Sequence, residues 1–148
     1  MIDWSLGRLG LFRVTDRILL GEYPDDDAFA RLAGLGVTDI LNVAATPNRR
    51  PGFAVHVIPI PDLEEMPLAD AERAVRLVKR VVTGGGRIFV HCMAGQNRSP
   101  GVVFLSLLHL GHDAAEAERM IVDASLDAIP RHPRIVTPRV VEHVRSLR

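Results

Sequence analysis

Cysteine is scarce in this chain, which holds one, Cys92, among its 148 residues. A single cysteine excludes an intramolecular disulfide, and a thiol that must stay reactive favours a reducing compartment, the cytoplasm. Net charge is also absent, because 18 Lys and Arg residues balance 18 Asp and Glu residues. The chain therefore carries no overall charge that would draw it to nucleic acid or to a membrane surface.

Long apolar runs are missing as well. The first ten residues, MIDWSLGRLG, hold no basic segment followed by an apolar stretch, so we expect neither a signal peptide nor a membrane span. We also find no internal repeat, low-complexity tract or linker. The sequence therefore predicts one domain over residues 1–148, built around one core.

Apolar periodicity predicts alternating strands and helices. The strands are expected at residues 11–14, 17–20, 38–43, 54–60 and 88–90, and the helices at 25–36, 68–82, 99–110, 114–125 and 138–147. The first two strands read as a hairpin, and the later helix-to-strand order implies parallel crossovers. We therefore predict an α/β fold with a central, mostly parallel sheet of about five strands flanked by helices.

One loop, between a predicted strand and a predicted helix, carries the chemistry of the chain. A loop of this length can curl around a tetrahedral anion, with N–H groups from about Met93 to Arg98 pointing inward. Gly95 permits the positive φ that such a curl requires. Arg98 offers a planar fork that matches two phosphate oxygens, and the same field favours Cys92 as a thiolate nucleophile.

The order His91-Cys92-x-x-Gly95-x-x-Arg98-Ser99 resembles the signature of the protein tyrosine phosphatase superfamily, and the chain most resembles its small dual-specificity phosphatases. The resemblance implies a cysteine-based phosphatase fold that works without a metal or another cofactor. It implies that Cys92 attacks phosphorus and that Arg98 holds the phosphate oxygens. Ser99 is expected to donate to the sulfur, a role compatible with capping the helix, and His91 is expected to orient the loop.

Further site residues are expected around this core. The phosphate is expected to contact the loop residues Met93, Ala94, Gly95, Gln96, Asn97 and Arg98. The resemblance also requires a carboxylic acid on a loop that reaches over the site, and Asp62, thirty residues before Cys92, is the candidate. Its rivals are Glu64, Glu65 and Asp70.

The substrate stays open at this point. Asn97 also occurs in the RNA 5′-triphosphatase branch of the superfamily, whereas Ala94 and Ser99 point away from that branch. Phosphoinositide phosphatases commonly carry basic residues inside the loop, and this loop has none before its arginine. We expect a shallow site that hydrolyses phosphotyrosine and also phosphoserine or phosphothreonine. The alternatives are an RNA 5′-triphosphatase or a small-molecule or phosphoinositide phosphatase of the same superfamily, a low-turnover phosphate-binding module, and a rhodanese-type sulfur carrier.

The remaining expectations concern surfaces and partners. We expect a monomer that acts on phosphoproteins and forms no stable complex with nucleic acid or membranes. Arg49 and Arg50 form either a solvated loop tip or a rim that attracts acidic groups. The aspartates 25–27 are expected to cap a helix, and a structural role is expected for Asn42. The thiolate of Cys92 is expected to be exposed and therefore sensitive to peroxide.

Overall fold

The computed structural model describes residues 3–45 and 50–148, and these residues form a five-stranded sheet of order β1-β2-β5-β3-β4. The strands are β1 (Leu11–Arg13), β2 (Ile18–Gly21), β3 (Asp39–Asn42), β4 (Ala54–Val57) and β5 (Ile88–His91). β1 and β2 pair antiparallel as a hairpin, and the other pairs are parallel. The predicted fold class is confirmed.

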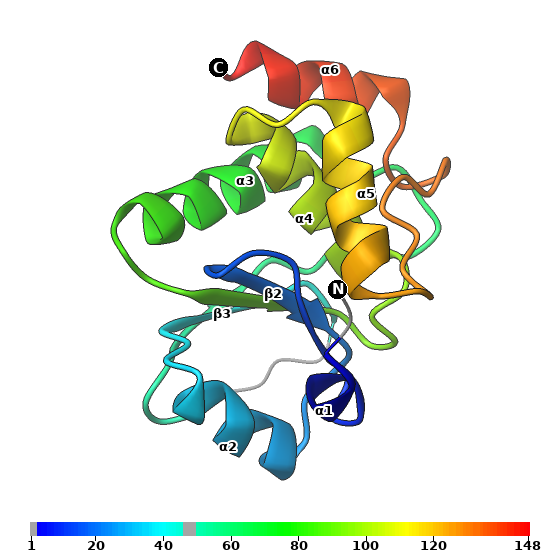
Figure 1. Ribbon diagram of the computed structural model, residues 1–148. Coiled ribbons are helices and arrows are strands. Elements are labelled where there is room, and N and C mark those ends of the chain that lie inside the picture. Colours follow the sequence, from blue (N-terminus) through cyan, green and yellow to red (C-terminus); the bar gives the residue numbers. More distant parts are fainter. Residues whose placement is uncertain (1–2, 46–49) are drawn as a thin grey trace.

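Helices cover both faces of the sheet (Figure 1). The two on one face are α1 (Trp4–Gly7) and α2 (Asp26–Gly34), and those on the other are α3 (Leu68–Thr83), α4 (Arg98–His109), α5 (Ala114–Ala124) and α6 (Pro138–Ser146). Asp25 caps α2 by accepting the Ala28 N–H at 2.8 Å, which confirms the expected role of that acidic run. The sequence analysis missed α1, which is too short to show a helical period.

The strands divide the core between two apolar clusters because their side chains alternate between the two faces. In β5, Ile88 and Val90 face the cluster under α3 to α6, whereas Phe89 faces the cluster under α1 and α2. The helix α4 lies at the centre of the larger cluster and is buried along nearly its whole length. The first turn of α4 is therefore held rigidly behind the loop that precedes it.

The end of β4 differs from its prediction. The sequence predicts a strand over residues 54–60, but β4 ends at Val57. Proline has no N–H to donate, so Pro59 cannot continue a regular ladder. The N–H groups of Ile58 and Ile60 still reach the carbonyls of Asn42 and Val43, both at 3.0 Å. The chain therefore continues beside β3 and places residues 60–62 at the edge of the sheet where β3 ends.

The register of the sheet brings four strand ends into one row. Gly21 of β2 and Asn42 of β3 both lie beside His91 of β5, and Asn42 also lies beside Val57 of β4. The segments that follow these strands therefore meet at the carboxyl edge, where open α/β sheets bind ligands. Within the described residues, none of the helices has the length and apolarity needed to cross a bilayer.

Candidate active site

The sulfur of Cys92 lies at the start of the loop of residues 92–97, which we call the phosphate loop. The Gly95 N–H donates to Sγ at 3.2 Å, and the Ser99 hydroxyl lies 3.3 Å from the same atom. The sulfur therefore has two hydrogen-bonding neighbours within the loop and the first turn of α4. The expectation of an exposed thiolate is wrong, since Cys92 is 2% exposed: the loop folds over its own first residue.

Ser99 has one hydroxyl proton and two neighbours that can accept it. Its Oγ lies 3.2 Å from the carbonyl oxygen of Gly21 and 3.3 Å from the sulfur of Cys92. A thiol can donate to Ser99 while Ser99 donates to Gly21, whereas a thiolate needs the serine proton itself. The expected capping role of Ser99 is wrong, because α4 begins at Arg98 and Asn97 is its cap residue.

The phosphate loop is anchored on both sides through its carbonyl groups. The carbonyl of Met93 accepts the N–H of Tyr23 at 2.9 Å, and the carbonyl of Gln96 accepts the N–H of Ile129 at 2.7 Å. In a trans peptide the next N–H points the opposite way, so these two bonds turn the N–H groups of residues 94 and 97 away from the anchors. This arrangement suits the predicted inward nest.

Gly95 adopts the positive φ expected of it, at 74°. A Cβ atom at this position would lie 2.9 Å from the backbone nitrogen of Glu22 and from the carbonyl carbon of Gly21. Backbone atoms cannot yield as flexible side-chain ends do, so both the conformation and the space require glycine here.

Arg98 joins the phosphate loop to the segment of residues 61–67, which we call the acid loop. Its Nη1 donates to the carbonyl of Ile60 at 3.2 Å, and its Nε lies 3.9 Å from Oδ1 of Asp62. The arginine side chain is 12% exposed and that of Asp62 is 46% exposed. The predicted clamp and the predicted acid therefore lie side by side, with the acid open to solvent.

Two of the three rival carboxyl groups are held in other contacts, and the third is exposed. Glu65 accepts hydrogen bonds from Arg139 at 2.8 Å and from Thr137 at 2.7 Å, and these bonds lower the pKa of Glu65. A carboxyl group held ionised is a poor proton donor. Asp70 pairs with Arg73 at 3.2 Å in the first turn of α3, while Glu64 is exposed.

His91 lies fully buried on the opposite face of β5 from the sulfur. Its ring stacks on Phe89 with centroids 5.6 Å apart and meets Tyr23 edge-on at 5.0 Å. Nδ1 lies 3.1 Å from the carbonyl oxygen of Cys92, and because a carbonyl only accepts, Nδ1 carries the proton. Burial lowers the pKa of His91 to about 4, so the ring is neutral at pH 7 and orients the loop.

The buried ring predicts a loss of stability in mild acid. Because folding lowers the pKa of His91 from 6.5 to about 4, the unfolded chain binds this proton more tightly. The free energy of unfolding should therefore decrease as the pH falls from about 6.5 to about 4, by up to about 3 kcal/mol from this group. Urea unfolding of the wild type and of His91→Asn across this range would measure it, and parallel curves would contradict the assignment.

The remaining predicted residues are placed as follows. Met93, Ala94 and Gln96 are exposed at the loop surface, and Asn97 is partly buried. Asn42 is buried, and its Oδ1 accepts the N–H of Ala44 at 2.9 Å, which fits the structural role expected of it. Arg50 pairs with Asp26 and lies over the ring of Phe29, whereas Arg49 lies outside the described residues.

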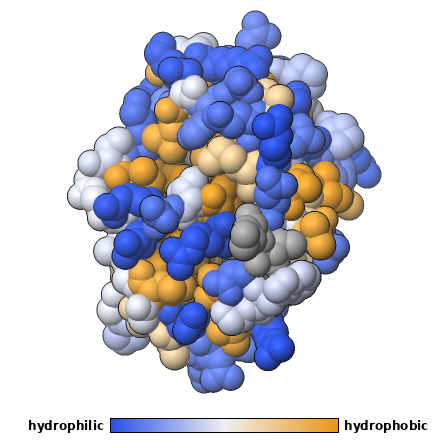
Figure 2. Space-filling model, viewed as in Figure 1, coloured by the Kyte–Doolittle hydropathy of each residue, from blue (hydrophilic) through white to orange (hydrophobic). Residues whose placement is uncertain are grey.

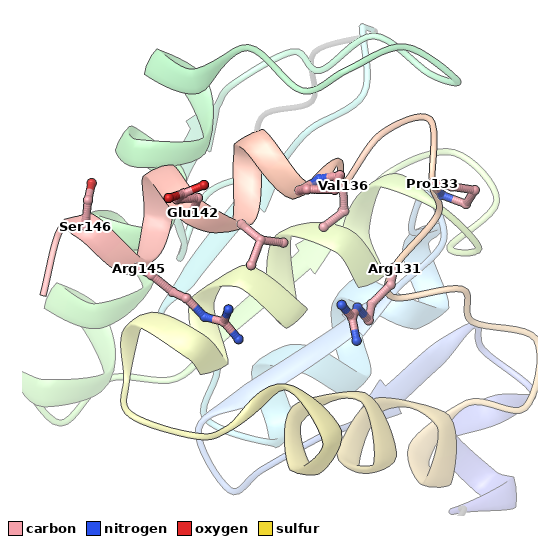
Figure 3. Close-up of a pocket in the computed structure, with 8 residues that line it drawn as sticks. Arg131, Pro133, Val136, Glu142, Arg145 and Ser146 are labelled. Carbon is pink, nitrogen blue, oxygen red and sulfur yellow. The ribbon is translucent and has the colours of Figure 1, made fainter.

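Two further observations concern metal-binding groups and cavities. Among the described residues, no group of three or more His, Cys, Asp or Glu side chains is placed to hold a metal ion. A cavity of about 900 Å³ lies apart from Cys92, between α6 and the segment before it, and Arg131 and Arg145 project into it (Figure 3). The cysteine and the arginine clamp therefore remain the centre of the candidate site.

Sequence reasoning missed the partners that hold the site together. Gly21 ends β2, Tyr23 follows it, Ile60 precedes the acid loop, and Ile129 follows α5. All four contribute through backbone atoms, which leave no mark in the sequence. The break Gly-Glu-Tyr-Pro after residue 20 was visible, but nothing local showed that β2 lies next to β5.

Comparison with known proteins agrees with this geometry. No model of a known protein family matches the chain. Human dual specificity protein phosphatase 2 is 26% identical over 132 residues, which cover 87% of this chain and 40% of that protein. Dual specificity protein phosphatase 1-B of Xenopus laevis is 29% identical over 110 residues, which cover 72% of this chain and 28% of that protein. The chain thus spans less than half the length of these relatives.

Solved structures match over nearly the whole chain. A mouse putative dual specificity phosphatase complexed with zinc tungstate has a TM-score of 0.80 and 26% identity, covering 94% of this chain and 89% of its own. Human DUSP28 has a TM-score of 0.76 and 29% identity, covering 93% of this chain and 91% of its own. PTPMT1 in complex with PI(5)P, at 18% identity, has the same fold with a TM-score of 0.75, covering 93% of both chains.

The fold and the phosphate loop are those of cysteine-based phosphatases. In sequence and in fold, the chain is similar to dual-specificity phosphatases of the protein tyrosine phosphatase superfamily.

Proposed function

We propose that this chain is a metal-independent phosphatase that hydrolyses phosphate monoesters on proteins through a phosphocysteine. One observation carries the proposal. The sulfur of Cys92 accepts the Gly95 N–H and touches Ser99 in the first turn of α4, while the neighbouring Arg98 reaches Asp62. A phosphate-binding module would need neither the sulfur nor the acid.

The first half of the reaction transfers the phosphoryl group to sulfur. The Cys92 thiolate attacks phosphorus, and the bond to the substrate oxygen breaks as the S–P bond forms. Arg98 and the N–H groups of the loop hold the three equatorial oxygens. Asp62, in its protonated form, gives its proton to the departing oxygen, so the leaving group departs as an alcohol or phenol.

The second half returns the enzyme to its starting state. Asp62, now a carboxylate, accepts a proton from the water that attacks phosphorus. The S–P bond breaks, inorganic phosphate leaves, and the Ser99 hydroxyl donates to the departing thiolate. The 3.3 Å separation of Ser99 Oγ and Cys92 Sγ supports this last role.

Phosphotyrosine is the substrate we propose first, with phosphoserine and phosphothreonine accepted as well. The relatives of this chain are dual specificity protein phosphatases, and Asp62 is open to solvent at the mouth of the site. We propose the cytoplasm as the compartment of the reaction, because the thiol must stay reduced. Phosphoinositide hydrolysis is the second candidate, favoured by the fold that the chain shares with PTPMT1.

A panel of four substrates tests the proposal. Phosphate release is measured in EDTA from a phosphotyrosine peptide, a phosphothreonine peptide, a 5′-triphosphate RNA and a phosphoinositide in vesicles. Each reaction is paired with Cys92→Ser as a blank. We expect release from the peptides, faster for phosphotyrosine. Release from RNA or from the lipid alone would overturn the protein substrate, and peptide release that survives in the blank would overturn the mechanism.

A further inference from the structure

Large apolar side chains are exposed at a few positions of the described chain. They are Trp4 (67%), Leu63 (40%), Met93 (51%), Val122 (37%), Leu126 (68%) and Ile129 (46%). Exposed apolar residues that are scattered singly need no explanation, whereas a cluster marks a binding surface. Five of these six belong to segments connected to the phosphate loop, as the next contacts show.

Three of the five border the mouth of the candidate site. Met93 is a residue of the phosphate loop itself. Leu63 follows Asp62, whose carboxylate accepts its N–H at 3.1 Å, and it takes a positive φ of 57°. Ile129 donates its N–H to the carbonyl of Gln96 at 2.7 Å. These three exposed side chains therefore belong to the phosphate loop, to the acid loop or to a segment that is hydrogen-bonded to the phosphate loop.

The other two, Trp4 and Leu126, line a cavity of about 500 Å³ between α1 and the end of α5, which we call the Trp4 cleft. Its remaining lining residues are Gly7, Arg8, Phe12, Ala124, Ser125 and Asp127. Leu126 is three residues from Ile129, so their Cα atoms are at most about 11 Å apart. Figure 2 shows apolar surface over the end of α5 and the loop that follows it.

The first strands place the other wall of the Trp4 cleft next to the same loop. The carbonyl of Gly10, just after α1, accepts the N–H of Glu22 at 3.2 Å, and the next residue, Tyr23, donates to Met93 at 2.9 Å. The segment after α1 is thus linked to the phosphate loop through residues 22 and 23, and the segment after α5 is linked to it directly through Ile129. The segments that form the Trp4 cleft are therefore tied to the phosphate loop from both sides.

The charge around this surface distinguishes a polypeptide substrate from a lipid in a membrane. Exposed acids follow β2 and β4 at the same edge of the sheet: Glu22, Asp25, Asp26, Asp27, Asp62 and Glu64. An anionic membrane surface attracts basic segments and repels acidic ones. The Trp4 cleft itself holds one cation, Arg8, and one anion, Asp127, so it offers a lipid surface no net attraction. A polypeptide with apolar side chains suits this edge better than a bilayer.

We propose that the Trp4 cleft is a specificity subsite that takes a large apolar side chain of the phosphoprotein, a few residues from the phosphorylated one. The inference rests on the proposed function, because it needs a peptide phosphate at Cys92. An extended peptide advances about 3.3 Å per residue, so the position of the preferred apolar residue relative to the phosphorylated one reports how far the Trp4 cleft lies from Cys92.

Peptide scanning tests the subsite. A phosphotyrosine peptide with serine at its flanking positions is compared with peptides that carry leucine at one position at a time, from five before to five after the phosphotyrosine. The kcat/KM of each is divided by that for p-nitrophenyl phosphate, which is too small to reach the Trp4 cleft. We expect leucine at one or two positions to raise this ratio roughly tenfold or more, as filling an apolar pocket does.

Matched variants assign the preference to the Trp4 cleft. Trp4→Ala and Leu126→Ser should each remove most of the leucine preference, and both residues are exposed, so folding is little affected and thermal unfolding checks it. Val122→Ser, at the sixth exposed apolar residue, should keep the full preference. Equal turnover of all peptides, or a preference that survives both cleft variants, overturns the subsite while the proposed function stands.

The remaining outcomes separate the subsite from the proposed function. If no peptide releases phosphate, the proposed function fails first. Turnover of a phosphoinositide in phosphatidylcholine vesicles that Trp4→Ala abolishes, with no leucine preference among peptides, would overturn the subsite in favour of a membrane-facing surface.

Discussion

Cys92→Ser lowers phosphate release from every accepted substrate by at least about 10⁴-fold, since loss of a nucleophile that acts within a concerted set removes most of the rate enhancement. A serine hydroxyl stays protonated at neutral pH, and the site offers it no general base: the buried ring of His91 is directed at the Cys92 carbonyl. The Gly95 N–H donates to the sulfur at 3.2 Å, a contact that stabilises a negatively charged nucleophile. A neutral serine hydroxyl gains less from it.

The same variant should keep its affinity for phosphate, because Arg98 and the N–H groups of the loop remain. Steady-state release measures the rate, and fluorescence or calorimetric titration with a phosphopeptide measures the binding. Ser99→Ala is the matched control: it leaves attack possible and should slow the second half-reaction, so phosphocysteine accumulates and mass spectrometry detects it. Wild-type turnover by Cys92→Ser would exclude the phosphocysteine route.

Asp62→Asn has the second largest expected effect. It should lower kcat by about 10²–10⁴-fold for phosphotyrosine and phosphothreonine peptides, the usual yield of a general acid. An asparagine amide keeps the shape of the side chain but gives up no proton to the departing oxygen. The loss should be far smaller for an aryl phosphate with a good leaving group, which departs without protonation.

The control for this variant lies in the same loop. Glu64→Gln removes an exposed carboxylate two residues away and should change kcat little. Asp62→Asn also removes the 3.9 Å contact with Arg98, but a pair with a 46% exposed partner contributes little to stability, so thermal unfolding should scarcely move. An equal loss for good and poor leaving groups would show that Asp62 positions Arg98 instead of donating a proton.

Local chemistry made much of this protein predictable. The residue order from His91 to Ser99 predicted the phosphate loop, and Gly95 predicted a positive φ within it. Strand and helix boundaries followed from apolar periodicity and from caps such as Asp25, because these signals act within a few residues. β4 departed from its prediction where Pro59 interrupts the ladder, and α1 was too short to be recognised.

The assembly of the site was decided at longer range. The sequence placed Asp62 among four candidate carboxyl groups, and the tertiary structure set it beside Arg98 while Arg139 and Thr137 engaged Glu65. It also buried Cys92, which was expected to be exposed, by closing the loop over the sulfur.

The sequence by itself determined which groups the candidate site contains: a thiol, a guanidinium, a hydroxyl and a loop that glycine lets curl. Only the tertiary structure decided what holds them, namely the carbonyls of Gly21 and Ile60 and the N–H groups of Tyr23 and Ile129. The physical reason is that backbone groups are the same in every residue. Their meeting depends on the strand order β2-β5-β3-β4 and its register, which distant parts of the chain settle together.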